Sequence, residues 1–242
     1  MRVLAISHQR DAGPGVFVEA SHSKGAALDY WMLPPSRSNN GTVIPPRNAG
    51  AYDAVMVFGG AMHADQVDSH PWLLGEKEFL ANLLERDVPI LGVCLGAQLL
   101  ADAAGMPPRR AKRPEIGWLA VDVSAEGRSD PLLGPLAPRF EAFQWHSYEF
   151  LLPPGAVPLA HSDVCLQAYR LRGSSWGTQF HAEVTRTDAA AWIDDYESDE
   201  DAVRMGLDAS ALRRRTDEAI QTWNELGRDL CRRFLDVVAT RA

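Results

Sequence analysis

Three short stretches of the chain are apolar at nearly every position: 2–7 (RVLAIS), 54–60 (AVMVFGG) and 88–94 (VPILGVC). Continuous apolar runs are typical of strands that are covered on both faces of a parallel sheet. Between the last two runs, residues 70–87 carry apolar side chains at three- and four-residue spacings, which predicts an amphipathic helix: Trp72, Phe79, Leu80, Leu83 and Leu84. Strand, helix and strand with short joints form a βαβ unit, so this part of the chain predicts an α/β fold, a mostly parallel open sheet flanked by helices.

The hydrophobic pattern changes twice further along the chain. From about residue 107 to 180 the sequence is rich in Pro and Gly, and its β-prone pieces alternate more, which predicts some antiparallel strands in this middle region. Six of the eight residues 194–201 are acidic, and we interpret them as an exposed link between helices. One apolar stripe then marks a long final helix: Ala219, Ile220, Trp223, Leu226, Leu230, Phe234 and Val238.

The chain has no internal repeat and no linker that divides it. Its 242 residues could form one large α/β domain or two small ones, and the lack of a linker favours one. We therefore predict a single domain over residues 1–242, with a catalytic α/β core over 1–185 and a helical C-terminal extension over 186–242.

Composition narrows the class of protein. Hydrophobic residues make up 46% and charged residues 23%, as in ordinary globular proteins. The formal net charge of -8, without a basic run, argues against nucleic-acid binding. No window approaches the roughly 18 to 20 apolar residues that span a bilayer, and the N-terminus lacks a signal peptide's apolar core. We therefore expect a cytoplasmic protein without membrane partners.

The cysteines and histidines indicate free side chains and no bound metal. Cys94, Cys165 and Cys231 are odd in number and form no Cys-x-x-Cys pair, which argues against disulfides and a zinc site. Five histidines show no metal-ligand spacing and are interpreted as surface or hydrogen-bonded polar residues: His8, His22, His63, His70 and His161. Because the chain also lacks a glycine-rich phosphate-binding motif, we predict no metal and no other cofactor.

Cys94 ends the third apolar run in the sequence GVCLG, directly before a predicted helix. In a G-x-nucleophile-x-G elbow, glycines make room for a strained turn that presents the nucleophile. The N-terminus of the next helix favours a thiolate, and the N–H of Leu95 is placed to stabilise a substrate oxyanion. A buried cysteine can also be an inert small apolar residue, so this motif alone leaves both interpretations open.

Two further motifs supply the other groups of an acyl-transfer site. In QFHAEV (179–184), residues two apart in a strand point to the same side, so His181 and Glu183 would form a base with its orienting carboxylate. The alternative is the polar face of an edge strand, but the presence of both motifs favours catalysis. In FGGAMH (58–63), Gly60 would be a second oxyanion donor, although a simple glycine turn fits equally well.

Together GVCLGAQLLADAAG (92–105), QFHAEV and FGGAMH resemble the class I glutamine amidotransferases, over about residues 50 to 185. EIGW (115–118) and PWL (71–73) are similar to the branch nearest the amidotransferase domain of GMP synthase, especially its free-standing relatives. This resemblance implies the family's flavodoxin-like fold and a Cys-His-Glu catalytic triad.

The resemblance also implies a role for each motif residue. Cys94 would attack the side-chain carbonyl of glutamine. His181 would protonate the departing ammonia and then activate the water that cleaves the γ-glutamyl thioester, while Glu183 orients His181. Gly60 and Leu95 would form the oxyanion hole.

Gln98, His146 and Ser147 are the candidate substrate-binding residues. In the segment WHSYEF (145–150), relatives carry a His-x-Asp-like sequence near the substrate's α-amino and carboxylate groups. Tyr148 and Glu149 change the chemistry of this segment, so specificity for glutamine alone is left open.

The predicted function is a glutaminase that releases ammonia from glutamine or a related γ-glutamyl compound through a cysteine thioester. The ammonia would pass to a separate synthetase subunit, or the protein would hydrolyse γ-glutamyl peptides or amides by itself. Two alternatives remain: a non-catalytic binding module with the amidotransferase fold, and a cysteine hydrolase that cleaves ordinary peptide bonds.

Overall fold

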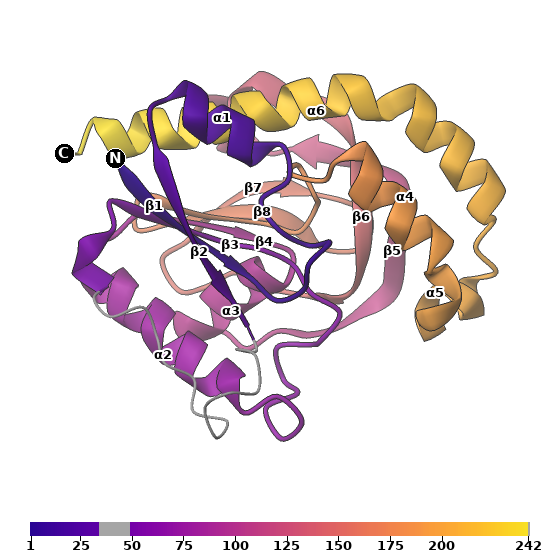
Figure 1. The fold of residues 1–242 in the computed structure, drawn as a ribbon, viewed down its shortest axis with the longest axis horizontal. Coiled ribbons are helices and arrows are strands. Elements are labelled where there is room, and N and C mark those ends of the chain that lie inside the picture. Colours follow the sequence, from indigo (N-terminus) through magenta and orange to yellow (C-terminus); the bar gives the residue numbers. More distant parts are fainter. Residues whose placement is uncertain (34–48, 242) are drawn as a thin grey trace.

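A mixed β-sheet crosses the part of the chain that the computed structural model describes, residues 1–33 and 49–241. Within it, nine strands follow the order β2-β1-β3-β4-β9-β8-β7-β5-β6. Figure 1 shows the sheet with helices packed around it. One half of the sheet is parallel and consists of β1 (Arg2–Ser7), β2 (Ala27–Met32), β3 (Ala54–Val57), β4 (Ile90–Val93) and β9 (Ser175–Thr178). β3, β4 and β9 are buried at every residue, and the apolar runs at β3 and β4 reflect helices on both faces.

The other half of the sheet is antiparallel and comes from the middle of the chain, as predicted. It consists of β5 (Arg109–Val123), β6 (Arg139–Glu149), β7 (Val157–His161) and β8 (Leu166–Leu171). β8 pairs antiparallel with β9, so four of the eight strand pairings in the described residues are antiparallel. The mixed sheet with flanking helices confirms the α/β prediction.

Helices cover the parallel half of the sheet on both sides. Val3 and Ala5 of β1 belong to a core shared with α1 (Phe17–Ser23) and α6 (Ala209–Ala239). Leu4 and Ile6 belong to the opposite core, shared with α2 (Trp72–Glu85) and α3 (Leu95–Ala103). Successive residues of a strand thus reach the two faces, and the sheet is the middle of three layers.

The C-terminal region is helical, as predicted. α4 (Arg186–Asp194) and α5 (Glu200–Met205) lead into α6, which lies along one face of the sheet (Figure 1). The predicted apolar stripe of α6 faces the core through Ile220, Trp223, Leu230, Phe234 and Val238. Short 3₁₀ turns cover Ala49–Ala51, Gly127–Ser129, Gly134–Leu136 and Tyr196–Ser198. Among the described residues, no helix combines the length and apolar character that a membrane crossing requires.

Candidate active site

Cys94 occupies a strained turn between β4 and α3. Its φ of 52° and ψ of −111° lie where side-chain-bearing residues are rarely found, and such backbone strain is common at active sites. The flanking glycines are required by close backbone contacts. A Cβ on Gly92 would lie 2.7 Å from the Gly96 carbonyl oxygen, and one on Gly96 would lie 2.1 Å from the Val57 carbonyl oxygen. The predicted elbow is therefore present, and its glycines let α3 pack directly against β3.

His181 and Glu183 lie close together, with 2.7 Å between Nδ1 and Oε1, and both side chains are buried. The prediction that they belong to a strand is wrong, because β9 ends at Thr178 and the pair lies in the following loop. Contacts from other elements fix this loop: the His181 N–H donates to the Phe143 carbonyl (3.0 Å), and Trp223 Nε1 of α6 donates to the His181 carbonyl (2.8 Å).

The His181 ring lies beside Cys94. Gly59 lies against both residues: a Cβ on Gly59 would lie 3.1 Å from His181 Cε1 and 3.8 Å from Cys94 Cβ. Burial by itself lowers the pKa of His181, but the negative charges of Glu183 and Cys94 and their hydrogen bonds outweigh it and raise this pKa to about 10. The arrangement favours an imidazolium that lies between the Glu183 carboxylate and the Cys94 sulfur, where it can act as the acid of cysteine acyl transfer.

A cavity of about 620 Å³ opens above Cys94 and His181. Its wall includes part of the acidic segment 194–201, which the sequence alone suggested to be an exposed link. The acidic side chains along the cavity are Asp11, Asp195, Asp199, Glu200 and Asp201. Besides His63 and His181, the basic side chains there are Arg110 and Arg204, and both arginines bind Asp201. The cavity is therefore predominantly acidic around a buried nucleophile.

Gly60, at this cavity, lies next to Leu95. Gly60 lines the cavity, and a Cβ on Gly60 would lie 3.2 Å from Leu95 Cδ2. Leu95 is the first residue of α3, so its N–H has no acceptor within the helix. The position of both residues beside Cys94 suits the donor roles that the sequence suggested.

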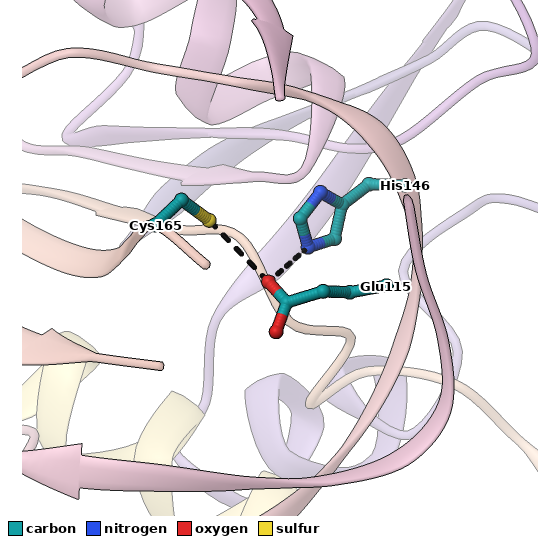
Figure 2. A group of neighbouring side chains, drawn as sticks. All are labelled: Glu115, His146 and Cys165. Carbon is teal, nitrogen blue, oxygen red and sulfur yellow. Dashed lines mark hydrogen bonds and ion pairs between the residues drawn. The ribbon is translucent and has the colours of Figure 1, made fainter. Parts of the chain in front are cut away.

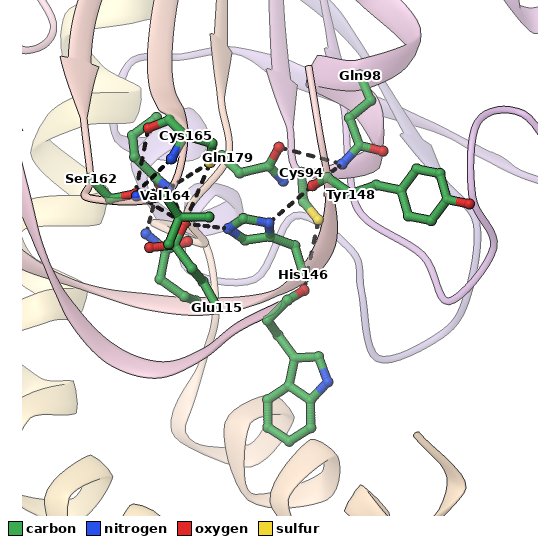
Figure 3. A network of polar contacts seen from close by, with 12 residues as sticks. Cys94, Gln98, Glu115, His146, Tyr148, Ser162, Val164, Cys165 and Gln179 are labelled. Atoms are coloured by element: carbon green, nitrogen blue, oxygen red, sulfur yellow. Dashed lines mark hydrogen bonds and ion pairs between the residues drawn. The ribbon is translucent and has the colours of Figure 1, made fainter. Parts of the chain in front are cut away.

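Of the three candidate substrate-binding residues, only Ser147 lines the cavity. Figure 3 shows Gln98 and His146 directed to the backbone of β6 instead. Gln98 Nε2 donates to the Tyr148 carbonyl (3.1 Å), and His146 Nδ1 lies 3.0 Å from the same oxygen. These two side chains therefore brace the strand that carries Ser147, and their direct contact with substrate stays a prediction.

His146 also belongs to a buried cluster with Glu115 and Cys165 (Figure 2). Glu115 Oε2 accepts hydrogen bonds from Gln167 Nε2 (2.8 Å), Ser162 Oγ (3.1 Å) and Cys165 Sγ (3.4 Å). His146 Nε2 lies 3.3 Å from this oxygen, without the alignment of a hydrogen bond.

The donor atoms of Glu115, His146 and Cys165 lie within 4.8 Å of one another, close enough to be considered as metal ligands. However, the Cys165 thiol is itself a donor to Glu115 Oε2 (3.4 Å). Glu115 is already occupied by protein donors. We therefore interpret the cluster as a hydrogen-bonded junction that joins β5, β6 and the β7–β8 connection.

Comparison with known proteins matches residues 29–195 to the family Glutamine amidotransferase class-I. The chain is 36% identical over 187 residues to the glutamine-hydrolyzing GMP synthase subunit of Halobacterium salinarum, and the match covers 72% of this chain and 91% of that protein. It is 31% identical over 153 residues to a gamma-glutamyl-L-1-hydroxyisopropylamide hydrolase of Pseudomonas sp., and the match covers 60% of this chain and 51% of that protein. The fold is similar to a glutamine amidotransferase from Thermotoga maritima, with a TM-score of 0.82, 28% identity and 97% of both chains covered.

Proposed function

This chain belongs to the class I glutamine amidotransferase family, and we propose that Cys94, His181 and Glu183 carry out its amide hydrolysis. The observation that carries the proposal is the buried imidazole between Glu183 and Cys94 at a cavity of substrate size. The substrate is glutamine or a related γ-glutamyl compound, and the products are glutamate and ammonia or an amine.

The reaction proceeds in two steps. The Cys94 thiolate attacks the side-chain carbonyl carbon, and the Gly60 and Leu95 N–H groups stabilise the oxyanion, with about 3 kcal/mol from each donor. The His181 imidazolium then protonates the departing nitrogen as the C–N bond breaks, which leaves a γ-glutamyl thioester on Cys94. In the second step His181 takes a proton from water, whose oxygen attacks the thioester and releases glutamate.

The electrostatics of the pair suit both steps. The thiolate charge is one of the causes that raise the pKa of His181, and acylation removes that charge. The pKa of His181 therefore falls as soon as sulfur bonds to the carbonyl carbon, before the C–N bond breaks, and the ring gives up its proton more easily to the leaving nitrogen. Glu183 keeps the ring oriented throughout, with its Oε1 on Nδ1.

The acceptor of the ammonia distinguishes two versions of the function. Similarity to the glutamine-hydrolyzing GMP synthase subunit supports delivery to a separate synthetase subunit. The acidic cavity of about 620 Å³ offers more room than glutamine's amide needs, and this supports hydrolysis of larger γ-glutamyl amides, as does the similarity to the Pseudomonas hydrolase.

We also propose that residues 1–242 act as one domain in the cytoplasm. Two side chains of α6 bind the catalytic loop, since Trp223 donates to the His181 carbonyl and Asn224 donates to the Val184 carbonyl. The C-terminal region is therefore part of the active-site architecture. The free thiols of all three cysteines suit a reducing compartment.

The proposal is tested by measuring ammonia release from glutamine, and amine release from γ-glutamyl amides, with and without a candidate synthetase subunit. Cys94→Ala is expected to abolish turnover of every substrate. Cys231→Ala is the matched control, because its thiol lies in the core beside α1, away from the cavity, and activity should persist.

Two results would decide against the proposal. One is amide hydrolysis that is unchanged in Cys94→Ala. The other comes from mass spectrometry after treatment with a glutamine-like diazoketone, if the label is found on Cys165 or Cys231 and not on Cys94.

A further inference from the structure

His8 and Glu76 form a second histidine–carboxylate pair. It lies outside the cavity and contacts the turn that carries Gly60. His8 directly follows β1, and Glu76 lies on α2. His8 Nε2 is 3.1 Å from Oε1 and 3.0 Å from Oε2 of Glu76, and both side chains are fully buried. The His8 ring also stacks on Trp72, with 5.5 Å between ring centroids. The pair is thus a rigid, desolvated unit.

The other ring nitrogen of His8 faces the backbone of the turn. Nδ1 lies 3.1 Å from the Phe58 carbonyl oxygen and 3.0 Å from the Gly59 carbonyl oxygen. Carbonyl oxygens only accept hydrogen bonds, so Nδ1 carries a proton, while Nε2 faces a carboxylate. Burial lowers the pKa of His8, but Glu76 and the two carbonyls outweigh this and raise it overall. The arrangement therefore fits an imidazolium that donates to the turn.

Because of the geometry of the peptide bond, the contact between His8 and the Gly59 carbonyl also sets the direction of the Gly60 N–H. The Gly59–Gly60 peptide is trans, so its C=O and N–H point in opposite directions. Because the Gly59 carbonyl points inward to His8, the Gly60 N–H points outward, and Gly60 lines the cavity. Within residues 1–33 and 49–241, no hydrogen-bond acceptor lies on this N–H. The next N–H, of Ala61, donates to Gln9 Oε1 (2.8 Å).

We propose that His8 and Glu76 are positioning residues that hold the Gly59 carbonyl and thereby aim the Gly60 N–H at the substrate oxyanion. This inference rests on the proposed function. The hydrogen bond from a cation polarises the peptide and makes its N–H a stronger donor, and the donor is oriented before the reaction begins. Packing alone does not call for this pair, since replacing a buried ion pair by apolar residues of similar volume is often neutral or stabilising.

The test compares two reactions of the same thiolate. Hydrolysis of γ-glutamyl-p-nitroanilide forms an oxyanion, whereas alkylation of Cys94 by iodoacetamide does not. The variants are Glu76→Gln, which removes the charge but keeps the shape, and the double variant His8→Phe/Glu76→Leu, which keeps apolar packing but cannot bind the carbonyls. Glu78→Gln is the matched control, because Glu78 is exposed on the same helix.

We expect kcat for the anilide to fall about 10-fold in Glu76→Gln and about 100-fold in the double variant, as for a misdirected oxyanion donor. The rate of alkylation and the KM should stay within about twofold of the wild-type values, and Glu78→Gln should match the wild type. If the double variant does not fold, Glu76→Gln carries the test.

The inference is overturned if folded Glu76→Gln and the double variant keep kcat, or if hydrolysis and alkylation fall in parallel, which would indicate a general loss of structure around Cys94. Failure of the proposed function has a different signature: the wild-type protein itself would show no Cys94-dependent hydrolysis of the anilide, of glutamine or of γ-glutamylhydroxamate, and the inference would fall with it.

Discussion

Glu183→Gln is the substitution that most directly tests the electrostatics of the site. It replaces a buried carboxylate by an amide of the same shape, whose oxygen still accepts the bond from His181 Nδ1. The geometry of the ring can therefore persist while the charge is lost. Burial, the largest influence on His181, would then act against the imidazolium with only Cys94 to oppose it.

The size of the effect follows from the pKa of His181. Its rise from 6.5 to about 10 corresponds to about 5 kcal/mol of preferential stabilisation of the imidazolium. Glu183 is the first of the groups that produce the rise, so the pKa should drop by at least about 1 to 2 pH units without its charge. A smaller imidazolium population and a less well oriented ring should together lower kcat/KM by about 10² to 10⁴.

The assay is an NMR titration of ring-labelled histidine, in which His181→Gln identifies the resonance of His181. Asp195→Asn is the matched control, because it removes a carboxylate from the same cavity without touching the ring, and the pKa of His181 should then stay near 10. The reasoning is refuted if Glu183→Gln leaves this pKa near 10 or if Asp195→Asn lowers it equally.

Three other measurements probe the elbow, the catalytic loop and the linkage of His181 to stability. Gly96→Ala places a methyl group 2.1 Å from the Val57 carbonyl oxygen, and since backbone cannot rotate away, the free energy of unfolding in urea should drop by at least about 3 kcal/mol. Trp223→Phe leaves the buried His181 carbonyl without its donor and should cost about 1 to 3 kcal/mol in thermal unfolding, together with lower kcat/KM. The raised pKa of His181 contributes stability that is fully present below about pH 6.5 and is lost as pH rises through about 10. The unfolding free energy of the wild type should therefore decrease over this pH range more steeply than that of Glu183→Gln. Equal slopes for the two proteins would contradict this linkage.

Local features of the site could be read from the sequence because they depend on neighbouring residues. The elbow at Cys94 is one such feature, since a Cβ on Gly92 would meet the backbone of Gly96, four residues further along the chain. The contact between His181 and Glu183 was also predicted, but for the wrong reason. The pair lies in a loop after β9, where two residues at this spacing can face each other as they can in a strand.

Alternation along β6 explains why only one of two neighbouring candidates reaches the cavity. Successive side chains of a strand point to opposite faces. Trp145 and Ser147 line the cavity, so His146 between them faces the interior, where it meets Glu115. The motif placed both His146 and Ser147 near substrate, and recognition of a regular strand at this point would have separated them.

Long-range contacts could not be read from the sequence. His8 and Glu76 are 68 positions apart, and neither belongs to a recognisable motif. The acidic segment 194–201 looks like a solvated link until α4 and α5 bring it over the cavity. α1, β2 and β7 were also not predicted. β2 is an edge strand in which no residue is buried, so the apolar run that marks an inner strand is missing.

The loop that follows β9 is held by distant segments because it forms no ladder of its own. Each of its four backbone carbonyls from His181 to Val184 meets a different partner: the Trp223 side chain at His181, the Gly227 backbone at Ala182, the Val16 N–H at Glu183 and the Asn224 side chain at Val184. A Cβ on Gly227 would lie 1.9 Å from the Ala182 carbonyl oxygen, so α6 approaches the loop as closely as backbone allows. A loop with unpaired carbonyls would sample many conformations, and the imidazole would then spend little time beside Cys94. The C-terminal helix therefore fixes the backbone of His181, the base, before substrate arrives. The glycine elbow does the same for Cys94, the nucleophile.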